Sequence, residues 1–72
     1  MKNFRIKSNL YLSVRELEIS KLVVSGKSSK QIASILNLSV HTVNTHRRNI
    51  INRVGAKNLA EVLYKLVKIG LI

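Results

Sequence analysis

A capping-box spacing recurs three times in this 72-residue chain and constrains its fold more than any other feature. In such a box, a Ser or Asn side chain accepts from a free backbone N–H at the start of a helix, and a Glu or Gln three residues later reaches back to the cap. The pairs are Ser13 with Glu16, Ser28 with Gln31, and Asn58 with Glu61. Three helices therefore have defined starts, and a further cap residue, Ser39, predicts a fourth.

The predicted helices end at residues that tolerate the left-handed backbone conformation. Gly26 and Gly55 follow the first and third helices, and Asn37 follows the second. These signals predict an all-α fold, a four-helix bundle with helices over about 14–25, 29–37, 40–54 and 59–69. Because only Asn37 and Leu38 separate the second helix from the cap of the third, the two must cross steeply, as in a helix-turn-helix.

The charge of the chain indicates an anionic partner. Thirteen Lys and Arg against three acids give a net charge of +10, and no acid lies between Glu18 and Glu61. The positive field of this window should attract a polyanion, either nucleic acid or an anionic membrane surface. The alternative is a basic domain whose charge only keeps it soluble.

The third predicted helix has two different faces. Val43, Ile50 and Val54 fall within about 40° of each other and form a core stripe, with Ile51 at its margin. The opposite stripe contains His41, Asn44, Thr45, Arg48 and Asn52. It has no acid and begins at a helix N-terminus, where free N–H groups favour phosphate. We interpret it as a surface for the DNA major groove; the alternative is an ordinary solvated face, which usually mixes Glu with Lys.

Residues 12–72 resemble the LuxR/GerE-type helix-turn-helix DNA-binding domain, through landmarks whose spacing is hard to reach by chance. The landmarks are Leu12-Ser13, Arg15-Glu16-Leu17-Glu18, Gly26, Ser28, Lys30, Ile32-Ala33, Leu36, Ser39, Thr42-Val43, His46, Ile50, Gly55 and Gly70-Leu71-Ile72. The resemblance implies a bacterial transcription regulator that binds double-stranded DNA, with the third helix in the major groove and the fourth helix mediating dimerisation.

The resemblance also implies which positions meet bases. In the family's Thr-Val-Lys-x-His stretch, the Lys position, the next one and the position three further on commonly do so, and here these are Asn44, Thr45 and Arg48. Asn44 departs from the family, since an amide pairs with adenine where Lys prefers guanine or phosphate. Phosphate contacts are expected from Lys30, Ser39, His41, Thr42, His46, Arg53 and Lys57. His46 could equally be a packed residue at the core margin.

Nothing in the sequence indicates catalysis, a cofactor or a metal site. His41 and His46 are five residues apart on a helix, about 140° around its axis, and cannot share one ion. The chain has no cysteine, no Ser/His/acid set and no phosphate-cradling Gly-rich loop. We therefore expect a binding protein that is not an enzyme.

The fourth predicted helix carries more apolar surface than one small core uses. A single polar stripe, formed by Glu61, Tyr64, Lys65 and Lys68, leaves most of its circumference apolar. We expect a homodimer through helix 59–69, on inverted half-sites, using Leu59, Val62, Leu63 and Leu66. One alternative is a helix fully used by the chain's own core. Another, for the whole chain, is a basic amphipathic module that binds a membrane or a protein partner.

Residues 1–11 lack a convincing period and are predicted to be a flexible tail or linker before the domain at 12–72. If the chain is the C-terminal part of a longer regulator, a receiver or sensor domain would precede it; otherwise it resembles the small stand-alone members. No apolar run matches a signal peptide or a membrane span, which predicts a cytoplasmic protein with no membrane partner. The family resemblance implies that it is bacterial and associated with the nucleoid.

Overall fold

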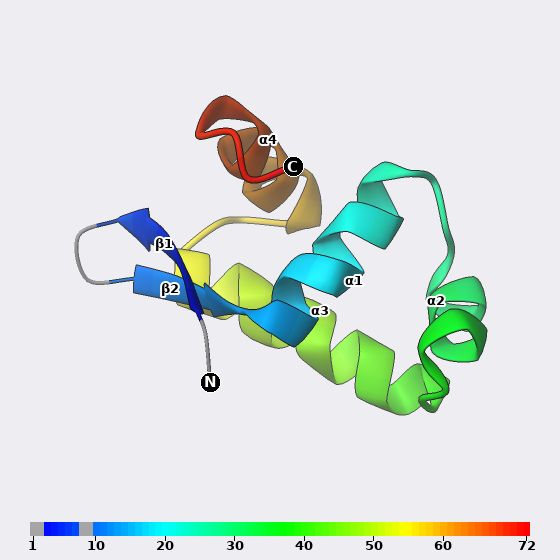
Figure 1. The fold of residues 1–72 in the computed structure, drawn as a ribbon. Coiled ribbons are helices and arrows are strands. Elements are labelled where there is room, and N and C mark those ends of the chain that lie inside the picture. Colours follow the sequence, from blue (N-terminus) through cyan, green and yellow to red (C-terminus); the bar gives the residue numbers. More distant parts are fainter. Residues whose placement is uncertain (1–2, 8–9) are drawn as a thin grey trace.

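The structure, a computed structural model, describes residues 3–7 and 10–72 as a short strand pair and four helices (Figure 1). The elements are β1 (Asn3–Lys7), β2 (Leu10–Ser13), α1 (Val14–Val24), α2 (Ser29–Leu36), α3 (Val40–Val54) and α4 (Leu59–Lys68). The four predicted helices and their connection as a helix-turn-helix are confirmed. Three of them end one residue earlier than expected, because Ser25, Asn37 and Ile69 are the C-caps.

The caps explain where the helices begin and end. Ser13 Oγ accepts from the Glu16 N–H at 3.1 Å, while Glu16 Oε1 accepts from the Ser13 N–H at 2.8 Å, and Ser28 and Gln31 repeat this arrangement. The third box is only half formed. Asn58 caps α4, but Glu61 Oε1 accepts from the N–H of Lys57 at 3.3 Å and not from that of Asn58.

One core holds the four helices together. α1 and α2 both pack on α3, and α4 packs on α3 as well (Figure 1). The predicted core stripe of α3 is confirmed, since Val43, Ile50 and Val54 are buried, and Ile51 is half-buried at its margin. The other buried apolar side chains are Leu12, Leu17, Ile19, Ile32, Ala33, Val62 and Leu66. No helix in the described part of the chain is long and apolar enough to span a membrane.

The strand pair differs from what the sequence predicts for residues 1–11. β1 and β2 are antiparallel, with Phe4 opposite Leu12, and β2 lies against α1 and α3. The alternation of apolar residues within β1 covers only Phe4 and Ile6, which is too short to indicate a strand. The strand forms because β1 pairs with β2. Residues 1, 2, 8 and 9 lie outside the described part. That the segment links to another domain stays a prediction.

Candidate nucleic-acid interface

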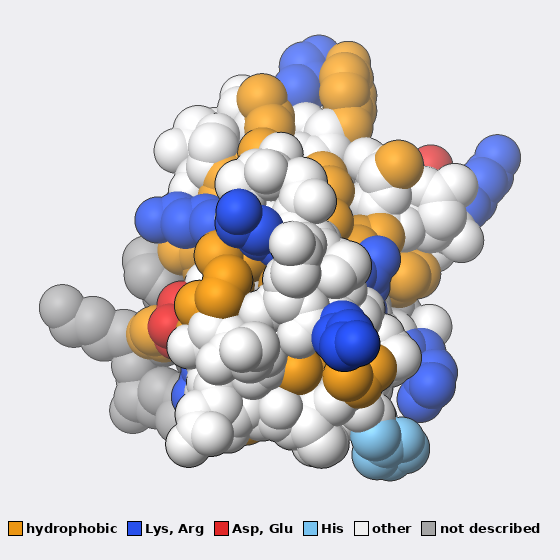
Figure 2. Space-filling view, turned by 90° about the vertical axis from the view of Figure 1, so that its right-hand side faces the viewer, with side chains coloured by type: hydrophobic (Ala, Val, Ile, Leu, Met, Phe, Trp, Pro, Cys, Tyr) orange, Lys and Arg blue, Asp and Glu red, His pale blue; other side chains and the backbone are white. Residues whose placement is uncertain are grey.

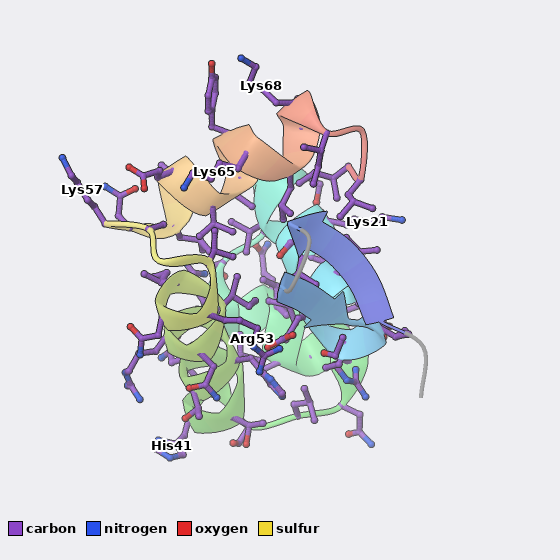
Figure 3. All side chains as sticks on the ribbon, turned by 90° about the vertical axis from the view of Figure 1, so that its left-hand side faces the viewer. Lys21, His41, Arg53, Lys57, Lys65 and Lys68 are labelled. Carbon is purple, nitrogen blue, oxygen red and sulfur yellow. The ribbon has the colours of Figure 1, made fainter. Side chains whose placement is uncertain are left out.

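The candidate interface is the outer face of α3. Ser39 starts this helix: its Oγ accepts from the Thr42 N–H at 3.0 Å and donates to Thr42 Oγ1 at 2.9 Å. Ser39, Val40 and His41 at the start of the helix are exposed, and His41 projects at this end of α3 (Figure 3). Opposite the buried stripe, the exposed side chains are His41, Asn44, Arg48, Asn49 and Asn52. The face therefore offers imidazole, amide and guanidinium groups without any carboxylate.

The three residues expected to read bases all come from this helix but differ in their surroundings. Arg48 is exposed. Thr45 is half-buried, and its hydroxyl donates to the carbonyl oxygen of His41 at 3.0 Å, so its methyl group is the part left for a contact with a base. Asn44 is exposed but not free, because Ser29 Oγ on α2 donates to its Oδ1 at 2.7 Å.

The residues expected to contact phosphate lie in different surroundings. Lys30 and Lys57 are exposed, and Thr42 and His46 are half-buried. Ser39 is held by its cap bonds to Thr42. In Figure 3, Lys57 and His41 lie at the two ends of α3 on its outer side, whereas Lys21 lies on the other side of the molecule.

Arg53 is a predicted phosphate contact whose charge is already paired within the chain. Its guanidinium forms an ion pair with the carboxylate of Glu16, which joins α3 to α1. The chain has only three acids, and one of them, Glu16, is buried. The second ion pair among the described residues joins Lys65 and Glu61 within α4, at 3.9 Å.

The cations other than Arg53 and Lys65 make the side of the molecule formed by α2 and α3 electropositive. Within residues 10–72, no carboxylate lies within ion-pair distance of Lys30, Arg47, Arg48 or Lys57. Figure 2, which views the molecule from the α2 side, shows Lys and Arg side chains spread over that face and acidic atoms only at its margins. Such an arrangement favours a polyanion over a neutral or cationic partner.

The residues expected to form a dimer surface on α4 do not all lie on the surface. Val62 and Leu66 are fully buried in the core of the single chain, so they cannot contact a second copy while this fold persists. Leu59 is half-buried against the same core, and Leu63 is half-buried as well. The exposed large apolar side chains of α4 and its C-cap are instead Tyr64, Val67 and Ile69. The Lys68 ammonium lies 5.6 Å from the ring centre of Tyr64.

Comparison with known proteins agrees with this geometry. The family model of bacterial regulatory proteins of the luxR family matches residues 10–66. The spore germination protein GerE of Bacillus subtilis is 34% identical over 70 residues, which cover 97% of this chain and 95% of GerE. The chain belongs to the luxR family of bacterial regulatory proteins. It has the helix-turn-helix DNA-binding fold of this family, as the resemblance implied.

The chain also matches parts of longer proteins. The transcriptional regulatory protein TdiR of Thauera aromatica is 42% identical over 57 residues, which cover 79% of this chain but 25% of TdiR. The crystal structure of Escherichia coli SdiA superposes with a TM-score of 0.83 and 36% identity, over 96% of this chain and 28% of that chain. The chain thus spans about a quarter of these two proteins and almost all of GerE.

Sequence reasoning missed two side chains at the site of this luxR-family domain. Arg47 Nη1 donates to Ser29 Oγ at 3.0 Å, and Ser29 in turn holds Asn44. A signal for Arg47 existed, because it lies about 40° from Val43 on the helix and a cation that close to the core stripe needs a partner. No sequence signal indicated Ser29, since its part depends on how α2 crosses α3.

Proposed function

We propose that this luxR-family domain regulates transcription by binding specific double-stranded DNA sequences with α3 in the major groove. The observation that carries the proposal is the exposed, carboxylate-free face of α3, opposite the Val43, Ile50 and Val54 stripe that fixes the helix to the core. A helix of 15 residues is about 22 Å long, enough to follow the groove over several base pairs.

Within this interface, we assign base readout to Asn44, Thr45 and Arg48. An Arg can pair bidentately with guanine O6 and N7, an Asn with adenine N6 and N7, and a Thr methyl can touch the thymine methyl. The cations that flank this set, among them Lys30 and Lys57, are assigned to phosphates, which position the domain without reading sequence. Arg53 is assigned a smaller share of the phosphate contacts, because Glu16 neutralises it.

We further propose that two copies pair on inverted half-sites through the exposed side of α4. Tyr64, Val67 and Ile69 place apolar surface on a helix that lies on the rim of the domain. A two-fold pairing would use the same patch on both copies, so the DNA half-sites would be inverted repeats.

The decisive experiment is a base-by-base affinity profile on a duplex selected from a random pool. Arg48→Ala should lose about 1–3 kcal/mol of discrimination at one base pair and keep its affinity for unrelated duplexes within a small factor. Lys21→Ala, which removes an exposed cation from the other side of the molecule, is the matched control and should leave every preference unchanged (Figure 3). If Arg48→Ala only scaled all affinities down together, Arg48 would be a phosphate anchor.

A membrane surface is the competing polyanion for so basic a chain. Binding to vesicles that contain anionic lipid, measured at the same ionic strength as duplex binding, separates the two. We expect the selected duplex to bind at protein concentrations at which the vesicles do not. Equal binding to both, without any sequence preference in the pool, would favour the amphipathic membrane module.

A further inference from the structure

Two hydrogen bonds between side chains connect the start of α2 to the recognition face of α3. Arg47 Nη1 donates to Ser29 Oγ at 3.0 Å, and Ser29 Oγ donates to Asn44 Oδ1 at 2.7 Å. We call this set of three residues the Ser29 relay. It joins positions 15 and 18 residues apart in the sequence, so it forms only when α2 and α3 take up their crossing.

The chemistry of the relay fixes its direction. A serine hydroxyl has one hydrogen to donate, and a guanidinium can only donate. Because Arg47 supplies a hydrogen to Ser29, the hydroxyl hydrogen of Ser29 remains for Asn44, and the cation polarises the hydroxyl into a better donor. The carbonyl oxygen of Asn44 is therefore held toward α2, and its amino group points away from α2.

Neither Ser29 nor Arg47 has another role among the contacts within residues 10–72 that would account for this arrangement. The cap of α2 is Ser28, so the hydroxyl of Ser29 is not needed to start the helix. Arg47 is half-buried and has no carboxylate within ion-pair distance in the described part of the chain. Arg47 thus holds the hydroxyl of Ser29, and that hydroxyl is directed at one amide on the candidate interface.

We propose that Ser29, held by Arg47, is a positioning residue that sets the base preference of Asn44; this inference rests on the proposed function. The carbonyl oxygen of Asn44 has two lone pairs, and the relay uses one. The other lone pair and the amino group remain for adenine N6 and N7. An amide that cannot turn presents its acceptor and donor in one order only, which matches adenine and rejects guanine, whose N7 and O6 are both acceptors.

The first test compares base profiles on the selected duplex. Ser29→Ala should lower the preference for adenine over guanine about three- to tenfold at the base pair read by Asn44, the worth of one hydrogen bond. Ser29→Thr keeps the hydroxyl and should retain the preference. Ser34→Ala, at an exposed serine of the same helix, is the matched control and should change nothing. A uniform loss of affinity in Ser29→Ala, for all duplexes alike, would overturn the proposal and make Ser29 a phosphate contact.

A double-variant comparison asks whether Ser29 acts through Asn44. In an Asn44→Ala background, adding Ser29→Ala should have no further effect on the profile, because the amide it positions is gone. If Ser29→Ala caused its full loss in that background, the hydroxyl would act on DNA directly, which would overturn the positioning role.

The second readout needs no DNA. In the ¹⁵N-labelled chain, the side-chain amide of Asn44 should have a clearly lower order parameter in Ser29→Ala than in the parent chain or in Ser34→Ala. An unchanged Asn44 amide would overturn the relay itself. A base profile that stayed unchanged in Asn44→Ala would instead overturn readout by Asn44 in the proposed function, so the two failures are distinguishable.

Discussion

Arg53, in the last turn of α3, forms an ion pair with Glu16, in the first turn of α1, across 37 positions of the chain. The same carboxylate oxygen of Glu16 accepts from the backbone N–H of Ser13 at 2.8 Å. The side chain of Glu16 is 5% exposed and that of Arg53 is 42% exposed. One carboxylate thus caps α1 and ties the end of the proposed recognition helix to the start of the bundle.

The first prediction concerns this ion pair. Glu16→Ala should lower the free energy of unfolding by about 3 kcal/mol, the lower end of the range for removing one partner of a buried pair, because the partly exposed Arg53 can rehydrate. Glu16→Gln keeps an acceptor for Ser13 and should lose about 1–2 kcal/mol. Urea unfolding measures both. Glu18→Gln changes an exposed acid of the same helix and should be near neutral, so an equal loss in Glu16→Gln and Glu18→Gln would refute the role of the pair.

The helix limits could be predicted because their causes are local in sequence. Ser13, Ser28 and Ser39 cap helices whose first turn supplies the partner atom, three residues away. The pairing of Glu16 with Arg53 could not be predicted, since it depends on how α1 crosses α3. The strand pair escaped prediction for the same reason: its register places Phe4 opposite Leu12, and neither strand has a convincing pattern alone.

The exposed face of α3 followed from helical periodicity, which sorts side chains by angle without knowledge of the neighbours. The hydrogen bonding of Asn44 on this face could not be predicted in this way, because its partner Ser29 lies on another helix. For α4, periodicity led to a wrong prediction of the pairing surface, for a related reason. It gave the width of the apolar arc but not which part faces the core, and Val62 and Leu66 proved to be fully buried.

The second prediction concerns the turn between α2 and α3. Asn37 has φ 57° and ψ 48°, the left-handed conformation, which costs most residues about 1–2 kcal/mol. Asn37→Gly should therefore keep the free energy of unfolding within a few tenths of a kcal/mol, whereas Asn37→Val should lower it by at least about 1 kcal/mol. Asn49→Ala, at an exposed helical position of α3, is the comparison and should be neutral or slightly stabilising. A loss in Asn37→Gly as large as in Asn37→Val would contradict this account.

The third prediction tests the proposed pairing through α4. Val67→Gln should weaken assembly of two chains on a full site by about tenfold or more, because a symmetric interface loses the same apolar contact twice. Sedimentation of the chain on the selected duplex measures the number of chains bound. Val24→Gln is matched to it, since Val24 is 49% exposed at the end of α1 and Val67 is 53% exposed. One chain per full site in the parent protein would rule the pairing out.

The last prediction separates the two cations near the end of α3. Lys57 is exposed on the outer side of the helix with no carboxylate within ion-pair distance among the described residues, whereas Arg53 is neutralised by Glu16. Binding of DNA releases about 0.9 counterion for each phosphate that a cation neutralises. Lys57→Ala should therefore weaken every duplex to a similar degree and lower the slope of log affinity against log salt concentration by about 1. Lys21→Ala removes the same charge from the other side of the molecule and should leave the slope unchanged (Figure 3).

Arg53→Gln provides the comparison within the interface. Because Glu16 already offsets the charge of Arg53, we expect a smaller change in the salt slope than in Lys57→Ala, together with a loss of folding stability that Lys57→Ala does not show. Titrations at several salt concentrations, carried out below the unfolding temperature of the weakest variant, keep the two effects apart. Equal slopes for Lys57→Ala and Lys21→Ala would mean that Lys57 contacts no phosphate. A larger slope change in Arg53→Gln than in Lys57→Ala would mean that Arg53 leaves Glu16 for the DNA when the complex forms.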